Sequence, residues 1–215
     1  MTALFDSLRH DAKTEKGRER LRGVLTAAID VFIECGYERA SLSKIIERSG
    51  GSRSTVYSSF GSKEGLFTAA LGMMAGDIYN AYVASYRHGR TIKEDLLSFA
   101  TIFLKAMLSP RSLGAVRLIY SETVHLPQIG EWFWREGLAA GYEGLAKVLE
   151  NHVDAPMDEL RESAAHFIEL LRGPLYHKAL CIPAMKITDE AVAHEAVYCT
   201  EFFLAYLEKR GGLRD

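Results

Sequence analysis

The chain has 215 residues, of which 48% are hydrophobic and 25% are charged, and its formal net charge is −2. This composition suffices for one or two globular domains with a buried core and excludes an extended disordered chain. The near-neutral charge argues against a protein that coats nucleic acid, and no apolar run is long enough to span a bilayer.

The first part of the chain predicts a polar arm followed by an amphipathic helix. We interpret the arm, residues 1–16, either as a solvated mobile tail or as a segment whose basic residues reach phosphates or the minor groove of DNA. From Leu21 to Cys35 apolar residues keep the helical period, and Gly36 ends the helix. We expect the apolar face of this helix to pack against Ile45, Ile46, Val56 and Phe60.

Residues 41–60 predict two short helices joined by a turn that contains glycine. Ser41 and Ser52 each stand where an N-cap is expected, and Gly50-Gly51 separates the helices. In the second helix only Val56 and Phe60 are expected to point inward, so its outer face is polar. A short helix, a tight turn and a second helix with a polar outer face are typical of a helix-turn-helix DNA-binding motif.

Side chains on and beside this outer face have the chemistry to contact DNA. Arginine pairs with guanine, serine and threonine bond to base edges or phosphates, and tyrosine bonds to phosphate. Lys63, at the start of the following helix, combines a cation with helix-terminal N–H groups. The predicted DNA-binding residues are Ser41, Ser43, Arg53, Ser54, Thr55, Tyr57, Ser58, Ser59 and Lys63.

The distribution of charge agrees with a DNA-facing surface at this end of the chain. Residues 1–65 contain 11 Lys and Arg against 9 Asp and Glu, whereas the remainder contains 15 against 19. A small basic excess therefore lies in the helix-turn-helix region, as a surface that faces phosphates requires.

The rest of the chain predicts further helices and no convincing strand. A long helix from Ser62 to about Tyr86 connects the helix-turn-helix region to the C-terminal part of the chain, and residues 87–90 form a loop. Further helices are predicted at residues 92–108, 113–125, 127 to about 153, 158 to about 180 with a kink at Gly173-Pro174, and 188–210. The predicted fold class is all-α, with a DNA-binding domain in residues 1–65 and a second helical domain in residues 66–215.

The order and spacing of the N-terminal residues resemble those of the TetR-type transcriptional regulators. The resemblance extends from about Leu21 to Leu66 and rests on residues 32–37, 41–45, 50, 52, 55–57, 60 and 62–64. It implies that the predicted residues contact a double-stranded DNA operator. Two positions depart from the family pattern: Gly51 replaces a branched apolar residue and Ile46 replaces alanine. We expect Ile46 to fill the space that Gly51 leaves beneath the turn.

Beyond Leu66 the resemblance is weaker, but residues 117–122 with Pro127, and residues 167–174, are similar to one ligand-domain subgroup of that family. It implies an effector pocket between helices and a homodimer formed by the last two helices. The wide apolar coverage of the last helix, including Phe203, favours a partner helix. Methionines and aromatic residues at helical spacing are also ordinary core residues, and Glu122 with His125 is equally a surface pair. The pocket candidates are Met73, Met74, Phe99, Phe103, Met107, Tyr120, Glu122, Trp132, Phe133 and Phe167.

The N-terminus and the cysteines predict a cytoplasmic location. Residues 1–6 turn polar at once, without the apolar core of a signal peptide. The three cysteines, Cys35, Cys181 and Cys199, are odd in number and far apart. Free thiols in a reducing compartment are the simplest interpretation.

Sequence motifs of enzymes are missing. His166-x-x-Glu169 reverses the Glu-x-x-His order of di-iron bundles, and there is no glycine-rich phosphate loop, G-x-S-x-G or zinc spacing. We therefore predict no enzyme, no cofactor and no metal.

The predicted function is a repressor that binds a palindromic operator as a homodimer and is released by a small apolar or aromatic effector. The alternative is an effector-free DNA-binding protein that acts through protein assembly.

Overall fold

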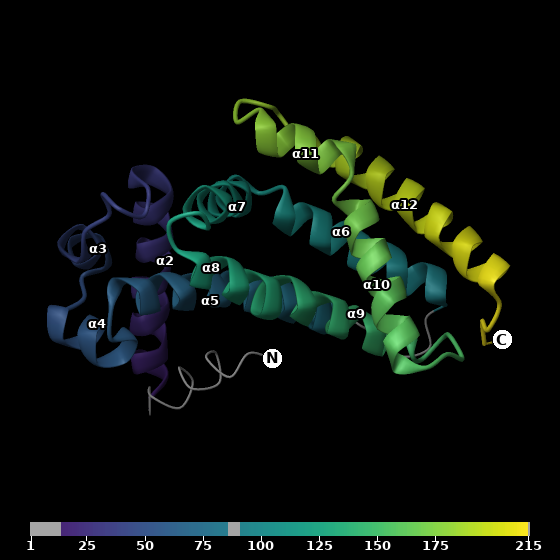
Figure 1. Cartoon of the computed structure of the whole chain (residues 1–215), viewed down its shortest axis with the longest axis horizontal. Helices are drawn as coiled ribbons and strands as arrows, with labels where there is room; N and C mark the ends of the chain where they lie inside the picture. The colour runs from purple at the N-terminus through teal and green to yellow at the C-terminus, as the bar shows by residue number, and fades with distance from the viewer. Residues whose placement is uncertain (1–13, 86–90, 215) are drawn as a thin grey trace. The chain divides into compact units, whose positions relative to one another are not determined.

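The computed structural model of the chain describes residues 14–85 and 91–214. The predicted all-α fold class is confirmed, since the described residues form helices and no named strand (Figure 1). The predicted arm up to residue 13 and the predicted loop at residues 87–90 lie outside the described residues. Within the described ranges no helix combines the length and apolar character needed to cross a membrane.

The chain divides into two compact units. The first comprises Met1–Asp77 and Gly114–Gly137, and the second comprises Ile78–Leu113 and Leu138–Asp215. Helix α5 (Lys63–Ser85) and helix α7 (Pro110–Glu122) each continue from one unit into the other. This division by compactness differs from the functional division predicted after residue 65, which stays a prediction.

The first unit contains the N-terminal helices. They are α2 (Glu15–Cys35), α3 (Leu42–Ser49), α4 (Arg53–Phe60), the first part of α5, most of α7, and α8 (Pro127–Trp132). Thr14 caps α2, because its hydroxyl accepts the N–H of Gly17 at 3.1 Å. The helix therefore begins inside the segment predicted to be an arm, and residues 15 and 16 are helical.

The core of the first unit joins α2 to the two short helices. Phe32, Tyr37 and Phe67 form an aromatic cluster with ring centroids 4.9–5.7 Å apart. Val56 and Phe60 are buried in the same apolar core, as is Ile45, whereas Ile46 is only partly buried at its edge. The predicted packing of α2 against α3 and α4 is confirmed.

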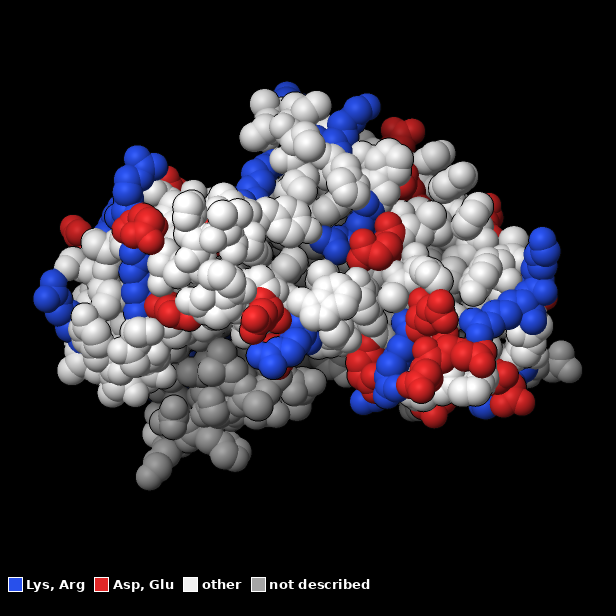
Figure 2. Space-filling model, viewed as in Figure 1, with Lys and Arg blue, Asp and Glu red and all other residues white. Residues whose placement is uncertain are grey.

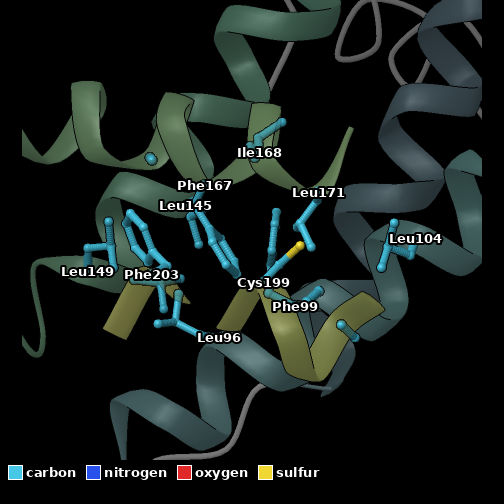
Figure 3. Close-up of a cluster of buried hydrophobic side chains, with 14 of the residues drawn as sticks. Leu96, Phe99, Leu104, Leu145, Leu149, Phe167, Ile168, Leu171, Cys199 and Phe203 are labelled. Carbon is cyan, nitrogen blue, oxygen red and sulfur yellow. The ribbon is translucent and has the colours of Figure 1, made fainter. Parts of the chain in front are cut away.

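The second unit is a group of helices around one apolar core. They are α6 (Ile92–Met107), α9 (Ala140–Leu149), α10 (Met157–Leu171), α11 (Pro174–Cys181) and α12 (Asp189–Arg210). Helix α12 lies against α6 and α10, and α9 lies against α10 (Figure 1). Phe167 stands near the centre of the core, with its ring centroid 4.7 Å from that of Phe203 and 6.2 Å from that of Phe99 (Figure 3).

Helix α12 has an inner face and an outer face, and this corrects one expectation. Phe203, expected on the outward apolar surface, is only 3% exposed because it packs against Phe167. Tyr198, Phe202 and Tyr206 are 57%, 58% and 40% exposed. These three residues are spaced by four and therefore line one side of the helix. We call Tyr198, Phe202 and Tyr206 the outer α12 stripe.

The single helix predicted from Pro127 to about Val153 is interrupted. Helix α8 continues into a π-helix, η1 (Phe133–Ala139), which continues into α9. Gly137 lies so close to the ring of Phe133 that an added Cβ would come within 2.9 Å of it. A π-helical segment widens the turn without a break in the chain, and apolar periodicity carries no signal for it.

The helix predicted from Asp158 to about Leu180 is broken rather than kinked. Helix α10 ends at Leu171 and α11 begins at Pro174, which occupies the first-turn position of the new helix. Proline has no N–H to continue the preceding helix but costs nothing at a helix start. The last predicted helix is confirmed as α12, where the Thr188 hydroxyl accepts the N–H of Ala191 at 3.1 Å.

The α9–α10 loop is held by a contact between His152 and the buried Asp95 and by the C-terminal segment. His152 Nε2 lies 2.9 Å from Asp95 Oδ2, and Asp95 is 1% exposed. Arg214 N donates to the carbonyl of His152 at 2.8 Å, and Val153 forms an antiparallel bridge with Leu213. Figure 2 shows further charged side chains of both signs gathered over the ends of α9 and α10. The start of α6, this loop and the C-terminal segment are therefore joined by polar contacts.

Candidate nucleic-acid interface

Helices α3 and α4 are delimited by local contacts that their sequences encode. Ser41 Oγ accepts the N–H of Lys44 and Ser52 Oγ accepts the N–H of Thr55, both at 3.2 Å. Gly50 ends α3 in the left-handed conformation, with φ of 67°. Because glycine has no Cβ, this conformation costs it little, and the chain turns sharply into α4. Both predicted serine caps are confirmed.

All nine predicted DNA-binding residues lie on α3, α4, the Ser41 cap or the first residue of α5. The inner face of α4 consists of Val56 and Phe60, which are buried as predicted. The other side chains of α4 divide into the exposed Arg53, Ser54, Tyr57 and Ser58 and the half-buried Thr55 and Ser59. Tyr57 is 54% exposed, although the large ring of a tyrosine usually packs against apolar surface. The outer face of α4 is thus polar and open.

Hydroxyl groups at the start of α4 are connected to one another. Ser52 Oγ lies 3.0 Å from Ser54 Oγ and 2.8 Å from Thr55 Oγ1. Ser58 Oγ donates to the carbonyl of Thr55 at 3.1 Å. A hydroxyl group can donate one hydrogen bond and accept others, so these contacts leave bonding capacity for a base edge or phosphate.

Lys63 is held at the start of α5 by two contacts. Its ammonium donates to the carbonyl of Glu38 at 3.0 Å and lies 4.6 Å from the ring centroid of Tyr37. Burial raises the pKa of Tyr37, so this ring stays neutral beneath the cation. An ammonium has three N–H donors, and those not used by Glu38 remain for an anion. The N-terminus of α5, where helix N–H groups also favour anions, lies at the same place.

A salt bridge between α2 and α3 was missed by sequence reasoning. Arg48 donates to both carboxylate oxygens of Glu34, at 2.6 and 2.9 Å. This hydrogen bonding lowers the pKa of Glu34. Lys44 Nζ donates to Cys35 Sγ at 3.0 Å, which raises the pKa of Lys44. Glu34 and Arg48 belong to different helices, so no periodic pattern marks them as partners. Two cations of α3 are therefore already engaged with α2.

Two glycines determine how closely the helices of this region approach. A Cβ on Gly65 would overlap the carbonyl oxygen of Phe60, so the glycine allows α5 to start directly against the end of α4. A Cβ on Gly51 would lie 3.1 Å from Ser49 Oγ and 3.3 Å from a methyl group of Val24. The expectation that Ile46 fills the space left by Gly51 was wrong, because Val24 and Ser49 occupy it.

The ten predicted pocket residues are divided between the two units. The first unit holds Met73, Met74, Tyr120, Glu122, Trp132 and Phe133, and the second holds Phe99, Phe103, Met107 and Phe167. Phe167 is completely buried as a core residue, whereas Tyr120 is 48% exposed. Trp132 Nε1 is buried and has no hydrogen-bond partner within the described part of the chain. Their role in ligand binding stays a prediction.

Histidine, cysteine and acidic side chains are dispersed in the described part of the chain. The described residues contain no group of three or more His, Cys, Asp and Glu side chains that would hold a metal ion. Burial raises the pKa of the Cys199 thiol to about 12, which keeps it protonated and unreactive.

Comparison with protein families matches both halves of the chain. Residues 24–70 match the family described as bacterial regulatory proteins, tetR family. Residues 94–207 match the family described as AefR-like transcriptional repressor, C-terminal domain. An uncharacterized HTH-type transcriptional regulator of Bacillus subtilis, YezE, is 28% identical over 130 residues, which cover 58% of this chain and 67% of YezE.

Solved structures of regulators share the fold. A protein described as a TetR-family transcriptional regulator from Mesorhizobium loti superimposes with a TM-score of 0.76 at 21% identity, covering 90% of this chain and 98% of that one. The flavonoid-responsive regulator FrrA superimposes with a TM-score of 0.64 at 25% identity, covering 87% and 96%. The proteins of this family are DNA-binding transcriptional regulators and not enzymes. The helix-turn-helix geometry and the two family matches lead to one conclusion: the chain belongs to the TetR family of transcriptional regulators.

Proposed function

We propose that the chain is a repressor that binds a palindromic operator as a homodimer and is released from it by a small apolar or aromatic molecule. In this proposal residues 1–65 bind DNA and residues 66–215 bind the effector and form the dimer. The main support for DNA binding by α4 is its outer face, which is polar and exposed. Only Val56 and Phe60 of this helix are buried in the core. The match of residues 94–207 to an AefR-like repressor domain supports repression rather than activation.

Dimerisation is supported by the outer α12 stripe. Three large exposed side chains in one line on a helix are typical of a surface that a partner covers. A second copy of the chain is the partner that a palindromic operator requires, because two reading helices related by a two-fold axis face two half-sites.

Removing single side chains from the proposed interface should show whether α4 and the start of α5 contact DNA. We expect Tyr57→Ala to weaken binding to a selected duplex about tenfold, the loss of about one good contact. Lys63→Ala should weaken binding to all duplexes alike and reduce the slope of log K against log salt by about one. Fluorescence anisotropy at several salt concentrations, with a duplex selected by the wild-type protein from a random pool, measures both effects.

The matched control for these variants is Lys93→Ala, which removes an exposed cation of α6 that lies 3.5 Å from Glu201. Its DNA affinity and salt slope should equal those of the wild type. Wild-type affinity in both Tyr57→Ala and Lys63→Ala would exclude α4 and the start of α5 from the interface.

Effector control is supported by two observations. FrrA, which shares 25% identity with this chain, is a flavonoid-responsive regulator, so an aromatic ligand is a reasonable class to test. Helix α5 begins at Lys63, beside α4, and continues into the second unit. In the dimer, the two DNA-binding domains must match half-sites about 34–36 Å apart, or a multiple of that distance. A ligand that favours another position of α5 would change the spacing of these domains, so they would no longer fit the operator.

If an effector releases the protein from DNA, then effector binding and DNA binding must weaken each other. We expect an aromatic compound, with the flavonoid naringenin as the first probe, to bind more weakly when the selected duplex is present. A coupling of about 1–3 kcal/mol corresponds to a change in affinity of about 5- to 150-fold, and it must be equal in both directions. Calorimetric titration with and without the duplex measures it. Equal affinities would mean that the bound compound does not control the DNA-binding head, which favours the effector-free alternative.

A further inference from the structure

Arg53 is the first residue of α4, but its side chain is bonded to α3. Its Nη2 donates a hydrogen bond to Ser43 Oγ at 2.5 Å, between residues ten positions apart. Ser43 is the second residue of α3, and both side chains are exposed. The N-cap of α3 is the neighbouring Ser41, so the Ser43 hydroxyl is not needed to start the helix. The contact therefore links the first turns of α3 and α4 at the open surface.

We propose that Ser43 is a positioning residue that orients the Arg53 guanidinium to read one base pair in each half-site. The proposal rests on the proposed function of α4 as the reading helix. N-terminal residues of a reading helix contact base edges, and arginine pairs bidentately with O6 and N7 of guanine. A guanidinium has five N–H donors in a rigid fork, so one bond to Ser43 leaves donors for the guanine.

The bond to Ser43 matters because a free arginine side chain samples many rotamers. Ordering such a side chain on a base costs conformational entropy, and that cost lowers the affinity for the correct base. When the guanidinium is already held by Ser43, part of this ordering precedes DNA binding. Ser43 then raises discrimination at the base pair that Arg53 reads without contacting that base pair itself.

The competing role for Ser43 is an independent phosphate contact, and the two roles have different signatures. A phosphate contact contributes equally to every sequence, and its loss adds to the loss of any other contact. A positioning residue acts through Arg53, so its removal changes discrimination at one base pair and has no effect once Arg53 is gone. Coupling between the two substitutions therefore distinguishes the roles.

The experiment uses the full chain and a duplex selected by the wild-type protein from a random pool, with single-base-pair substitutions through each half-site. Discrimination is measured as the ratio of the affinities for the selected duplex and for a duplex substituted at one base pair. Arg53→Ala should lower this ratio about 5- to 100-fold at one base pair, the range of a bidentate contact. Ser43→Ala should remove about three- to tenfold at the same base pair, as expected for the loss of one supporting hydrogen bond, and none elsewhere. Ser43→Thr, which keeps the hydroxyl, should restore it. Arg53→Lys should lose the discrimination and keep the salt slope.

The double variant Ser43→Ala/Arg53→Ala should discriminate no worse than Arg53→Ala alone. Additive losses in the double variant would overturn the positioning role, as would a uniform weakening by Ser43→Ala with a smaller salt slope. Thermal melting of Ser43→Ala should match the wild type, which excludes a folding defect. If the wild-type protein enriches no duplex at all, then the proposed function fails and the positioning role fails with it.

Discussion

Replacing His152 with alanine is expected to lower the free energy of unfolding by about 3 kcal/mol, the largest effect on stability that we expect from a polar residue of the second unit. His152 Nε2 is 2.9 Å from Asp95 Oδ2, and the Asp95 side chain is 2% exposed. The other oxygen, Oδ1, is buried without a hydrogen-bond partner in the described part of the chain. Loss of the imidazole would therefore leave a buried carboxylate with no side-chain partner.

Urea unfolding at fixed protein concentration, followed by circular dichroism, measures this change. Lys105→Ala is the matched control, because it removes a pair with Asp189 at 3.4 Å whose side chains are 57% and 92% exposed. Such an exposed pair contributes at most about 1 kcal/mol. The double variant Asp95→Leu/His152→Leu should recover much of the loss, since neither polar partner remains buried. A His152→Ala protein as stable as the wild type would show that Asp95 does not depend on His152.

Introducing a charge at Phe202 is expected to convert the proposed dimer into monomers and to abolish operator binding. Phe202 is 58% exposed and central in the outer α12 stripe. In a two-fold interface one substitution acts twice. Two losses of about 2 kcal/mol each would raise the dimer dissociation constant about 1,000-fold. Sedimentation velocity of Phe202→Glu over a range of concentrations measures the change, with circular dichroism to check that the helices remain.

The neighbouring Phe203→Ala provides the contrast between an interface and a core residue. Phe203 is 3% exposed and its ring centroid is 4.7 Å from that of Phe167, so its truncation should cost about 3–5 kcal/mol of folding stability. Phe203 is buried and reaches the outer stripe only by stacking on Tyr206, with ring centroids 5.7 Å apart, so the folded Phe203→Ala protein should still dimerise at low temperature. If Tyr198→Glu and Phe202→Glu both sediment as intact dimers, the dimer interface lies on another face.

Local sequence determined most helix ends of this protein. Ser41 and Ser52 are predicted as N-caps, and each accepts a backbone N–H three residues later; Thr91 and Thr188 cap α6 and α12 in the same way. A cap and a left-handed glycine act over one turn of chain, so the residues that define them are adjacent in sequence. The polar outer face of α4 followed in the same way from the helical period. The helix-turn-helix motif could therefore be predicted from the sequence alone.

Longer helices were predicted in position but not in detail. The kink predicted at Gly173-Pro174 is instead a break between two helices, although its position is correct, whereas the π-helix at Phe133–Ala139 had no sequence signal. Proline acts through its own missing N–H, a local cause. A π-helical turn depends on how side chains such as Phe133 and Gly137 fit against each other, and residue type alone does not encode that fit.

Only the tertiary structure decided which side chains meet. Phe202 and Phe203 are adjacent phenylalanines on α12, and the position of α10 determines that Phe203 is the one in the core. Asp95 and His152 are 57 residues apart, and Arg53 reaches Ser43 across the turn between two helices. Apolar periodicity reports that a face is buried but not what buries it. Hydrogen bonds between helices depend on angles and distances that are set when the whole core packs. The sequence by itself therefore determined where the helices lie along the chain, and the tertiary structure decided which side chains contact one another.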